Sequence, residues 1–234
     1  MKHAATLAAV LVALAGCSSP LASRRAQVME PGELEVSFVP YGEATAIAAK
    51  GTGAAQPVAY PFAEATARFG VVDRMDIQLK VDPTIIPEIN VAYEIIGDPT
   101  KNDFAVTASL GLKPSVIAVP GASAGLITTP LELIMDVPLG DTSALVVGTR
   151  IIPAVTFAGA VTAVAGAVTV APGGFVALHI DLGPFFVRPE IAVNGVIPLI
   201  AGAPGAAVLG PPLGTGNFVL ALGVGGTLDF RKKQ

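Results

Sequence analysis

The stretch Met75-Asp76-Ile77-Gln78-Leu79-Lys80-Val81-Asp82 alternates between apolar and polar side chains at every position. Successive side chains of a β-strand point to opposite faces, so this pattern predicts a strand with one apolar face and one charged face. The same alternation returns in residues 88–95, 131–137, 176–182 and 185–194. We therefore expect an all-β chain whose strands separate two different environments.

Runs of this kind predict about ten strands, each close to the ~9–11 residues that a tilted strand needs to cross a bilayer. The connections between them alternate between short turns and long loops, which is typical of a closed antiparallel up-and-down transmembrane β-barrel. The strands are expected near residues 33–41, 61–70, 74–82, 85–96, 103–113, 129–138, 143–155, 173–182, 185–195 and 216–230. The long loops are expected at 42–60, 114–128, 156–172 and 196–215.

The composition agrees with a membrane barrel and excludes some other classes of protein. Hydrophobic residues make up 52% of the chain and charged residues only 14%, against a usual charged share of about 25%. The longest uncharged stretches, 151–178 and 191–228, contain prolines, glycines and β-branched residues, which favour strands and turns over a membrane helix. The acidic balance, 18 Asp and Glu against 14 Lys and Arg, argues against a nucleic-acid surface.

The N-terminus predicts export and lipidation. An apolar run leads into Leu14-Ala15-Gly16-Cys17, which resembles the lipobox of bacterial lipoproteins, and Cys17 is the only cysteine of the chain. The resemblance implies a signal peptide at residues 1–16, acyl chains such as palmitate on Cys17, and a lipidated tether at 17–32. It also implies the lipoprotein-processing machinery as a partner. Ser18 after the cysteine is similar to lipoproteins sent to the outer membrane.

From residue 33 to residue 230 the chain resembles a small outer-membrane β-barrel of Gram-negative bacteria. The end of the last strand, residues 223–230, is similar to the C-terminal signal that the barrel-insertion machinery reads. Gly225, Leu228 and Phe230 match that signal, whereas Gly223 stands where a polar residue is expected and a short basic tail, 231–234, follows. The resemblance implies a porin-like protein of the outer membrane, in contact with its lipid and anchored by its N-terminus on the periplasmic side.

If lipid contacts the apolar face, the charged face fills the lumen. We expect an interior network of ten residues, in a lumen that is largely plugged by paired charges or open as a narrow, cation-preferring pore. The network comprises Glu64, Arg68, Asp76, Lys80, Glu88, Arg150, His179, Asp181, Arg188 and Glu190.

The sequence predicts a non-catalytic structural or surface protein without metal or cofactor. His179 is the only histidine left after signal cleavage, and it shares a strand face with Asp181 near the periplasmic half. We interpret His179 as a structural lumen residue. An outer-membrane hydrolase is the competing hypothesis, and it requires His179 for turnover.

Aromatic residues are expected in two interfacial belts, one at each end of the strands. Phe69, Tyr93, Phe104, Phe185 and Phe230 fall near the short turns. Tyr41, Tyr60, Phe62, Phe157, Phe175 and Phe218 fall near the long loops.

The alternative is a soluble periplasmic barrel that is tethered by Cys17 and binds an apolar ligand inside. The two hypotheses differ in which face is apolar: the soluble barrel places Ile77, Leu79, Val91, Leu133 and Ile180 inside and Asp76, Glu94 and Asp136 outside. The small apolar loops at 115–126, 158–170 and 196–213 are expected to extend the strands as hairpins, to hold an apolar small molecule at the loop side, or to contact lipopolysaccharide or a partner.

Overall fold

The computed structural model describes residues 21–48, 55–82, 86–98, 103–119, 122–160, 163–195, 197–200 and 216–231. The expected signal peptide, Cys17, the end of the basic tail and most of the last long loop lie outside these ranges. Within them the chain forms the strands β1 (Glu33–Ala48), β2 (Ala55–Val72), β3 (Met75–Val81), β4 (Pro87–Ile96), β5 (Ala105–Val119), β6 (Ala122–Thr128), β7 (Leu131–Gly140), β8 (Ser143–Ala160), β9 (Ala163–Leu182), β10 (Phe185–Gly195), β11 (Ile197–Ile200) and β12 (Gly216–Asp229).

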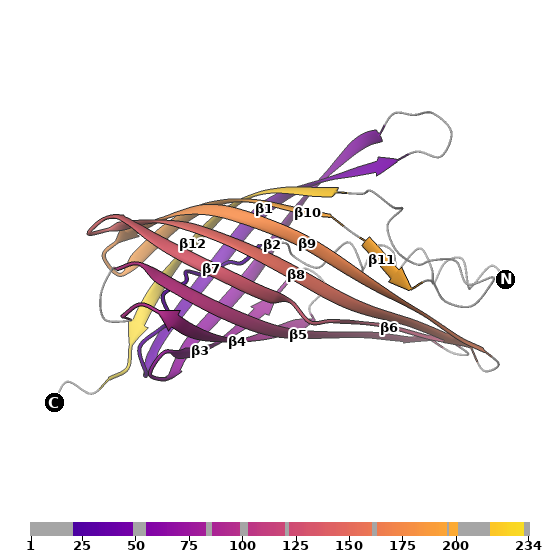
Figure 1. Cartoon of the computed structure of the whole chain (residues 1–234), viewed down its shortest axis with the longest axis horizontal. Coiled ribbons are helices and arrows are strands. Elements are labelled where there is room, and N and C mark those ends of the chain that lie inside the picture. Colours follow the sequence, from indigo (N-terminus) through magenta and orange to yellow (C-terminus); the bar gives the residue numbers. More distant parts are fainter. Residues whose placement is uncertain are drawn as a thin grey trace.

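The strands form one closed antiparallel sheet (Figure 1). Most strands pair with the next strand in sequence, and β12 closes the ring by pairing with β10 on one side and β1 on the other. Strands β6 and β7 both pair with β5 and β8, so they form one wall position interrupted near Pro130. Strand β11 continues β10 alongside β9. The barrel therefore has ten wall positions, as the sequence predicts.

The observed strands overlap all ten predicted ones. Some extend well beyond the predicted bounds, and others begin or end one or two residues inside them, such as β3 at Met75–Val81 against the predicted 74–82. Residues 156–172, expected as a long loop, belong to a hairpin that stays paired up to Ala160 and Ala163. Residues 114–128 likewise form the paired hairpin of β5 and β6. The hairpins therefore project beyond the ring at the end opposite the short turns (Figure 1). The expectation that these loops extend the strands is confirmed for both stretches.

The two faces of the wall are apolar outside and polar inside. Ile77, Leu79 and Leu133 are 38%, 41% and 45% exposed, whereas Asp76, Glu94 and Asp136 are fully buried. Strand β4 alternates between exposed and buried side chains at successive positions. Val91 is exposed as well, and Ile180 is half-buried. This orientation is the one expected for a wall in lipid and the reverse of the one that the soluble alternative requires.

The aromatic side chains near the short turns face outward, as the expected belt requires, whereas part of the second expected belt does not. Phe69, Tyr93, Phe104, Phe185 and Phe230 all point outward and are exposed. Tyr41 and Phe175, expected in the second belt, point into the barrel and are only 6% and 4% exposed. Tyr41 packs on Phe62, 5.5 Å between ring centroids, because the lumen there is lined by apolar side chains. A complete second belt was therefore a wrong expectation.

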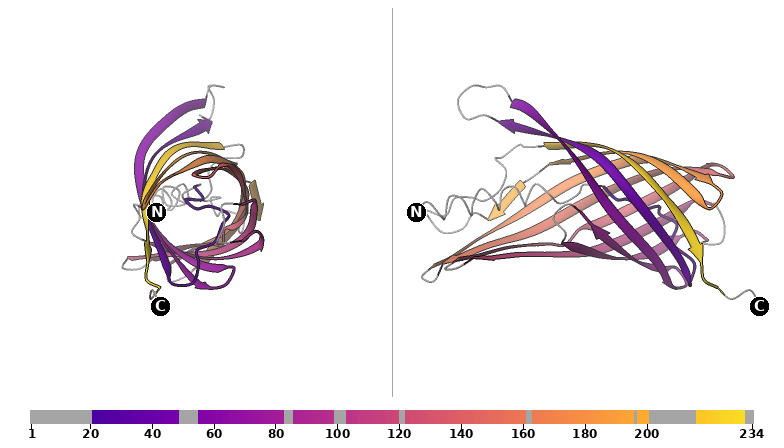
Figure 2. Two further views of the ribbon diagram at one scale, coloured as in Figure 1. Left: turned by 90° about the vertical axis from the view of Figure 1, so that its left-hand side faces the viewer. Right: turned by 180° about the vertical axis from the view of Figure 1, so that it is seen from behind.

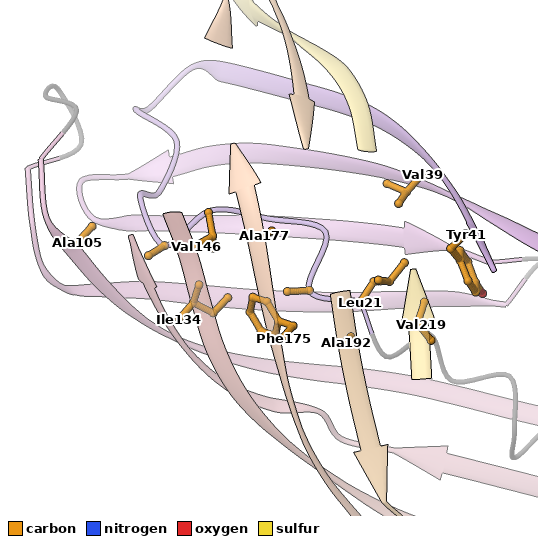
Figure 3. Close-up of a cluster of buried hydrophobic side chains, with 12 residues drawn as sticks. Leu21, Val39, Tyr41, Ala105, Ile134, Val146, Phe175, Ala177, Ala192 and Val219 are labelled. Carbon is orange, nitrogen blue, oxygen red and sulfur yellow. The ribbon is translucent and has the colours of Figure 1, made fainter. Parts of the chain in front are cut away.

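The lumen is occupied by the chain that precedes β1. Residues 21–29, which we call the plug, run inside the ring of strands (Figure 2, left). Leu21, Ala22 and Ala26 of the plug belong to a buried apolar cluster with inward side chains of the wall. Figure 3 shows Leu21 between Phe175 of β9 and Val219 of β12, with Ile134 and Val146 farther along the same cluster. The stretch expected to be a tether thus contains a structural part of the barrel. None of the described residues forms a helix long and apolar enough to cross a membrane.

Candidate functional site

The plug leaves the lumen at the short-turn end through a tight passage beside β2. Gly32 donates its backbone N–H to the Gly70 carbonyl at 3.2 Å, and Pro31 forms a β-bridge with Gly70. A Cβ atom at Gly70 would lie 2.0 Å from the Glu30 carbonyl oxygen. Glycine is therefore required at this position of β2, because any side chain would displace the turn that joins the plug to β1.

Asp76 of β3 holds the plug at two points. Its carboxylate accepts hydrogen bonds from Arg24 Nη2 at 2.9 and 3.2 Å and from the backbone N–H of Met29 at 3.2 Å. The same carboxylate accepts a bond from Arg68 Nη2 at 2.8 Å, and Arg68 also pairs with Glu35 at 3.3 Å. All four charged side chains are buried, so this cluster is a desolvated network that compensates its charges internally.

Asp136 of β7 holds the middle of the plug. Its carboxylate accepts hydrogen bonds from Arg25 Nε at 2.9 Å and from the backbone N–H groups of Ala26 and Gln27 at 2.9 and 3.3 Å. Every one of these donors belongs to the plug. Glu94 of β4 adds a bond from the Val28 N–H at 3.1 Å. The wall carboxylates thus serve as acceptors for the backbone of a segment that has no strand partner of its own.

The other end of the plug lies deeper in the barrel and contacts basic as well as acidic groups. The Leu21 carbonyl accepts hydrogen bonds from Lys80 Nζ at 2.7 Å and from Arg150 Nη1 at 3.2 Å. The Ala22 N–H donates to Glu190 Oε1 at 2.9 Å. Ser23 has a left-handed φ of 53°; its hydroxyl bonds Glu64 and its carbonyl accepts a bond from Gln78 at 3.1 Å. Donors and acceptors of the wall therefore fix this end in one register.

The structure brings the predicted lumen residues together around the plug. Nine of the ten are buried inside the barrel, and the side chain of Asp181 is 38% exposed near the short-turn end. Lys80 pairs with Glu88 at 3.6 Å, and Arg150 pairs with Glu132 at 3.0 Å. The sequence reasoning missed the plug arginines. The signal that could have found them is the excess of acidic over basic residues on the inward face, which calls for cations from elsewhere in the chain.

Some buried polar atoms of this network have no hydrogen-bond partner among the residues that the structure describes. Arg188 is fully inside the barrel, and neither of its Nη atoms has a hydrogen-bond partner within the described ranges. Its guanidinium lies 5.6 Å from the centre of the Phe186 ring. One carboxylate oxygen each of Glu64 and Glu94 is also without a protein partner. Buried polar groups of this kind are normally satisfied by ordered water. These atoms are therefore the positions at which water inside the lumen would bind.

His179 lies toward the short-turn end, as the sequence predicts. Its Nε2 is 2.8 Å from Asp181 Oδ1, and its ring packs on Phe186 with centroids 4.9 Å apart. The pair borders a cavity of about 170 Å³ whose other lining residues include Arg25, Arg68 and Glu35. Its polar lining thus combines ion-paired groups with the uncharged side chains of Gln27 and Thr227. No group of three metal-ligating side chains occurs among the residues that the structure describes.

No known protein-family model matches the sequence, and no curated protein matches it either. Several solved structures resemble the fold. Ail, the attachment invasion locus protein of Yersinia pestis, matches with a TM-score of 0.39 and 7% identity over 85% of this chain and 100% of that chain. Neisserial surface protein A matches with a TM-score of 0.40 and 11% identity over 85% and 99%. The monoaromatic hydrocarbon channel TodX matches with a TM-score of 0.32 and 9% identity over 86% and 91%. Because these scores and identities are low, the role of this chain is inferred from its own residues.

Proposed function

We propose that this protein is a lipid-anchored outer-membrane β-barrel that acts as a non-catalytic surface or structural protein, with its lumen closed by the plug. The observation that carries the proposal is the reversal of the usual faces: exposed apolar side chains cover the outside of the wall, and the ion pairs lie inside. A closed barrel also satisfies the backbone hydrogen bonds of every wall position, which a segment in lipid requires.

The outer face is too apolar for a protein whose wall contacts water. Soluble monomers rarely expose a continuous apolar patch larger than about 300–600 Å². Here the exposed valine, leucine, isoleucine and phenylalanine side chains come from nearly every strand of the ring. Lipid is the medium in which this surface has no hydrophobic cost. The short turns and the projecting hairpins then give the orientation: short turns toward the periplasm and hairpins toward the outside.

The plug makes closure, rather than conduction, the resting state of the lumen. It fills the short-turn half with apolar packing and with charge-assisted hydrogen bonds at Asp76 and Asp136. A narrow pore is the state expected when the plug is absent. Its wall would lose the plug arginines, so that Asp136 would lack Arg25 and Asp76 would keep only Arg68 of β2, and the acidic path would prefer cations.

The lipid anchor on Cys17 is proposed from the lipobox resemblance, with the lipoprotein-processing and barrel-insertion machineries as partners. Labelled palmitate fed to cells should appear in the intact protein and be absent from a Cys17→Ser variant. An intact protein without the label would remove the anchor from the proposal and leave the barrel standing.

The barrel and its closure are tested on one purified sample. In a gel of the detergent-extracted protein, boiling should shift the mobility of a folded membrane barrel, and a sample without that shift contradicts the barrel in lipid. In planar bilayers, the intact protein should be silent. A variant with residues 21–29 replaced by nine Gly and Ser residues should conduct and favour cations.

The matched control carries the same nine Gly and Ser residues in the exposed turn at Asp141, which leaves the plug untouched. This control should shift on boiling and stay silent. Equal conductance of the intact protein and the plug variant would show that the plug does not close the lumen.

A further inference from the structure

The direction of the plug along the barrel can be followed on β3. Met29 bonds Asp76, Ser23 bonds Gln78 and Leu21 bonds Lys80, through hydrogen bonds of 3.2, 3.1 and 2.7 Å. As the residue number falls, the contact on β3 therefore moves steadily away from the short turn that precedes Met75. The chain reaches β1 from inside the barrel, and its earlier residues lie deeper in the lumen than its later ones.

The neighbouring strands give the same direction independently. Leu21 bonds Arg150, seven residues into β8 from its short-turn end at Ser143, and Ala22 bonds Glu190, five residues into β10 from Phe185. The later plug residue Val28 bonds Glu94, two residues from the end of β4 at Ile96. Three wall positions on different sides of the lumen thus agree on how the plug is oriented.

The depth of Leu21 follows from strand geometry. A strand that rises about 3.3 Å per residue and tilts by about 40° advances roughly 2.5 Å per residue along the barrel axis. Lys80 is five residues beyond the start of β3, so the Leu21 carbonyl lies about 12 Å into an apolar band that is roughly 25 Å tall. Leu21 is therefore near the middle of the membrane, inside the lumen.

Cys17 precedes Leu21 by four residues, which span at most about 13–14 Å when extended. Continuing in the direction of the plug, this length is enough to reach the mouth formed by the long hairpins. To return to the periplasmic end, the chain would first have to reverse. A β-turn alone uses four residues, and the lumen below Leu21 already holds the plug.

We propose that the chain is threaded through its own barrel, so that lipidated Cys17 leaves at the hairpin mouth and its acyl chains enter the outer leaflet at the cell surface. This inference rests on the proposed function, because it assumes both the barrel in lipid and the anchor. It replaces the expectation of a periplasmic anchor with a surface one. The plug is then part of the anchor's path, and the wall folds around it.

The test is a protease-accessibility experiment on cells that express the full chain. A flexible segment of roughly 20 residues carrying a specific protease site is inserted between Ser18 and Ser19. Such a segment spans about 22–27 Å on average, which lets the site leave the lumen at whichever end the chain emerges. Protease added to intact cells should cut this variant to completion. The matched control has the same segment after Gln234 and should be cut only after the outer membrane is permeabilised.

Two readouts on the same cells separate failure of the threading from failure of the proposed function. The shift in gel mobility on boiling reports the barrel, and palmitate incorporation reports the anchor. With both present, an N-terminal site that is cut only after permeabilisation overturns the threading. A site that resists protease under both conditions overturns it as well, because the segment would then remain enclosed.

Discussion

The two halves of the barrel are built from different side chains. In the short-turn half, the plug and the wall share a network of buried ion pairs that includes Arg24 with Asp76 and Arg25 with Asp136. In the half with the long hairpins, the wall is made largely of Ala, Val, Gly and Thr, and residues 151–178 carry no charge. The plug is positioned by directional polar contacts, and the projecting hairpins are specified by the backbone pairing of their strands.

This difference shows how a segment without secondary structure can be held in place inside a barrel. Ion pairs in a lumen are directional, so they place a segment without secondary structure in a single register. A hairpin of small side chains needs no such partners, because β8 and β9 pair along their whole length. Substitutions in the short-turn half should therefore cost more stability than similar substitutions in the hairpins.

The largest expected effect is the loss of Asp136. Asp136→Ala removes the carboxylate that accepts hydrogen bonds from Arg25, Ala26 and Gln27 of the plug. Arg25 is then left buried without its closest carboxylate. Removing one partner of a buried pair costs about 3–5 kcal/mol. Denaturant unfolding in detergent, followed by the gel shift, should show this loss. The control Asp141→Ala lies in an exposed turn and should change the free energy of unfolding little. Equal stability of the two variants would contradict the role of Asp136.

The next largest effect is expected for a lysine on the outer face, and it should differ between the short-turn half and the projecting hairpins. Leu79→Lys places a cation about 10 Å into the apolar band, where it should cost about 2–4 kcal/mol and reduce membrane insertion. Val155 is also exposed, but it lies 12 residues into β8, about 30 Å from the short-turn end at 2.5 Å per residue. Val155→Lys should be tolerated. Measuring the folded fraction after insertion into vesicles compares the two, and an equal loss would place the hairpin in lipid.

The wall was predictable from the sequence because its signal is local. The alternation of apolar and polar residues, as in 75–82, can be recognised from adjacent positions alone. It indicates that the two faces of the strand lie in different environments, whichever strands it pairs with. The inward set of charges follows from the same pattern, and nine of the ten predicted network residues are buried. The hairpin extensions were harder to predict, because small residues such as Ala, Gly and Val show no contrast between the faces.

The plug was not predictable in the same way because its signal is not local. Residues 21–29 have neither a strand nor a helix period, and their polar partners lie on β2, β3, β4, β7, β8 and β10. Their position depends on a closed ring that brings Asp76 and Asp136 to one lumen. Tyr41 and Phe175 were misplaced for a related reason, since an aromatic side chain suits either a lipid interface or an apolar part of the lumen.

A smaller effect is expected where the plug leaves the lumen. In Gly70→Ala the new methyl group would collide with the Glu30 carbonyl, so the turn into β1 must shift, at a cost of about 1–3 kcal/mol. Gly42 of β1 has no atom within 4 Å of an added Cβ, so Gly42→Ala is the matched control and should be near neutral. The comparison is made by unfolding in detergent. A Gly70→Ala variant as stable as the control would mean that the plug does not pass so close to β2.

The smallest effect is expected at the short-turn rim, where Arg231 pairs with Glu30, with Glu33 at 2.9 Å and with Asp229 at 2.8 Å. Asp229 is exposed here because β12 ends at this residue. Exposed ion pairs contribute about 0–1 kcal/mol, so Arg231→Ala should lower stability only slightly, and salt should remove the difference. If Arg231→Ala lowered the free energy of unfolding as much as Asp136→Ala, also in high salt, the contacts that chiefly hold the plug would lie at the rim and not in the lumen.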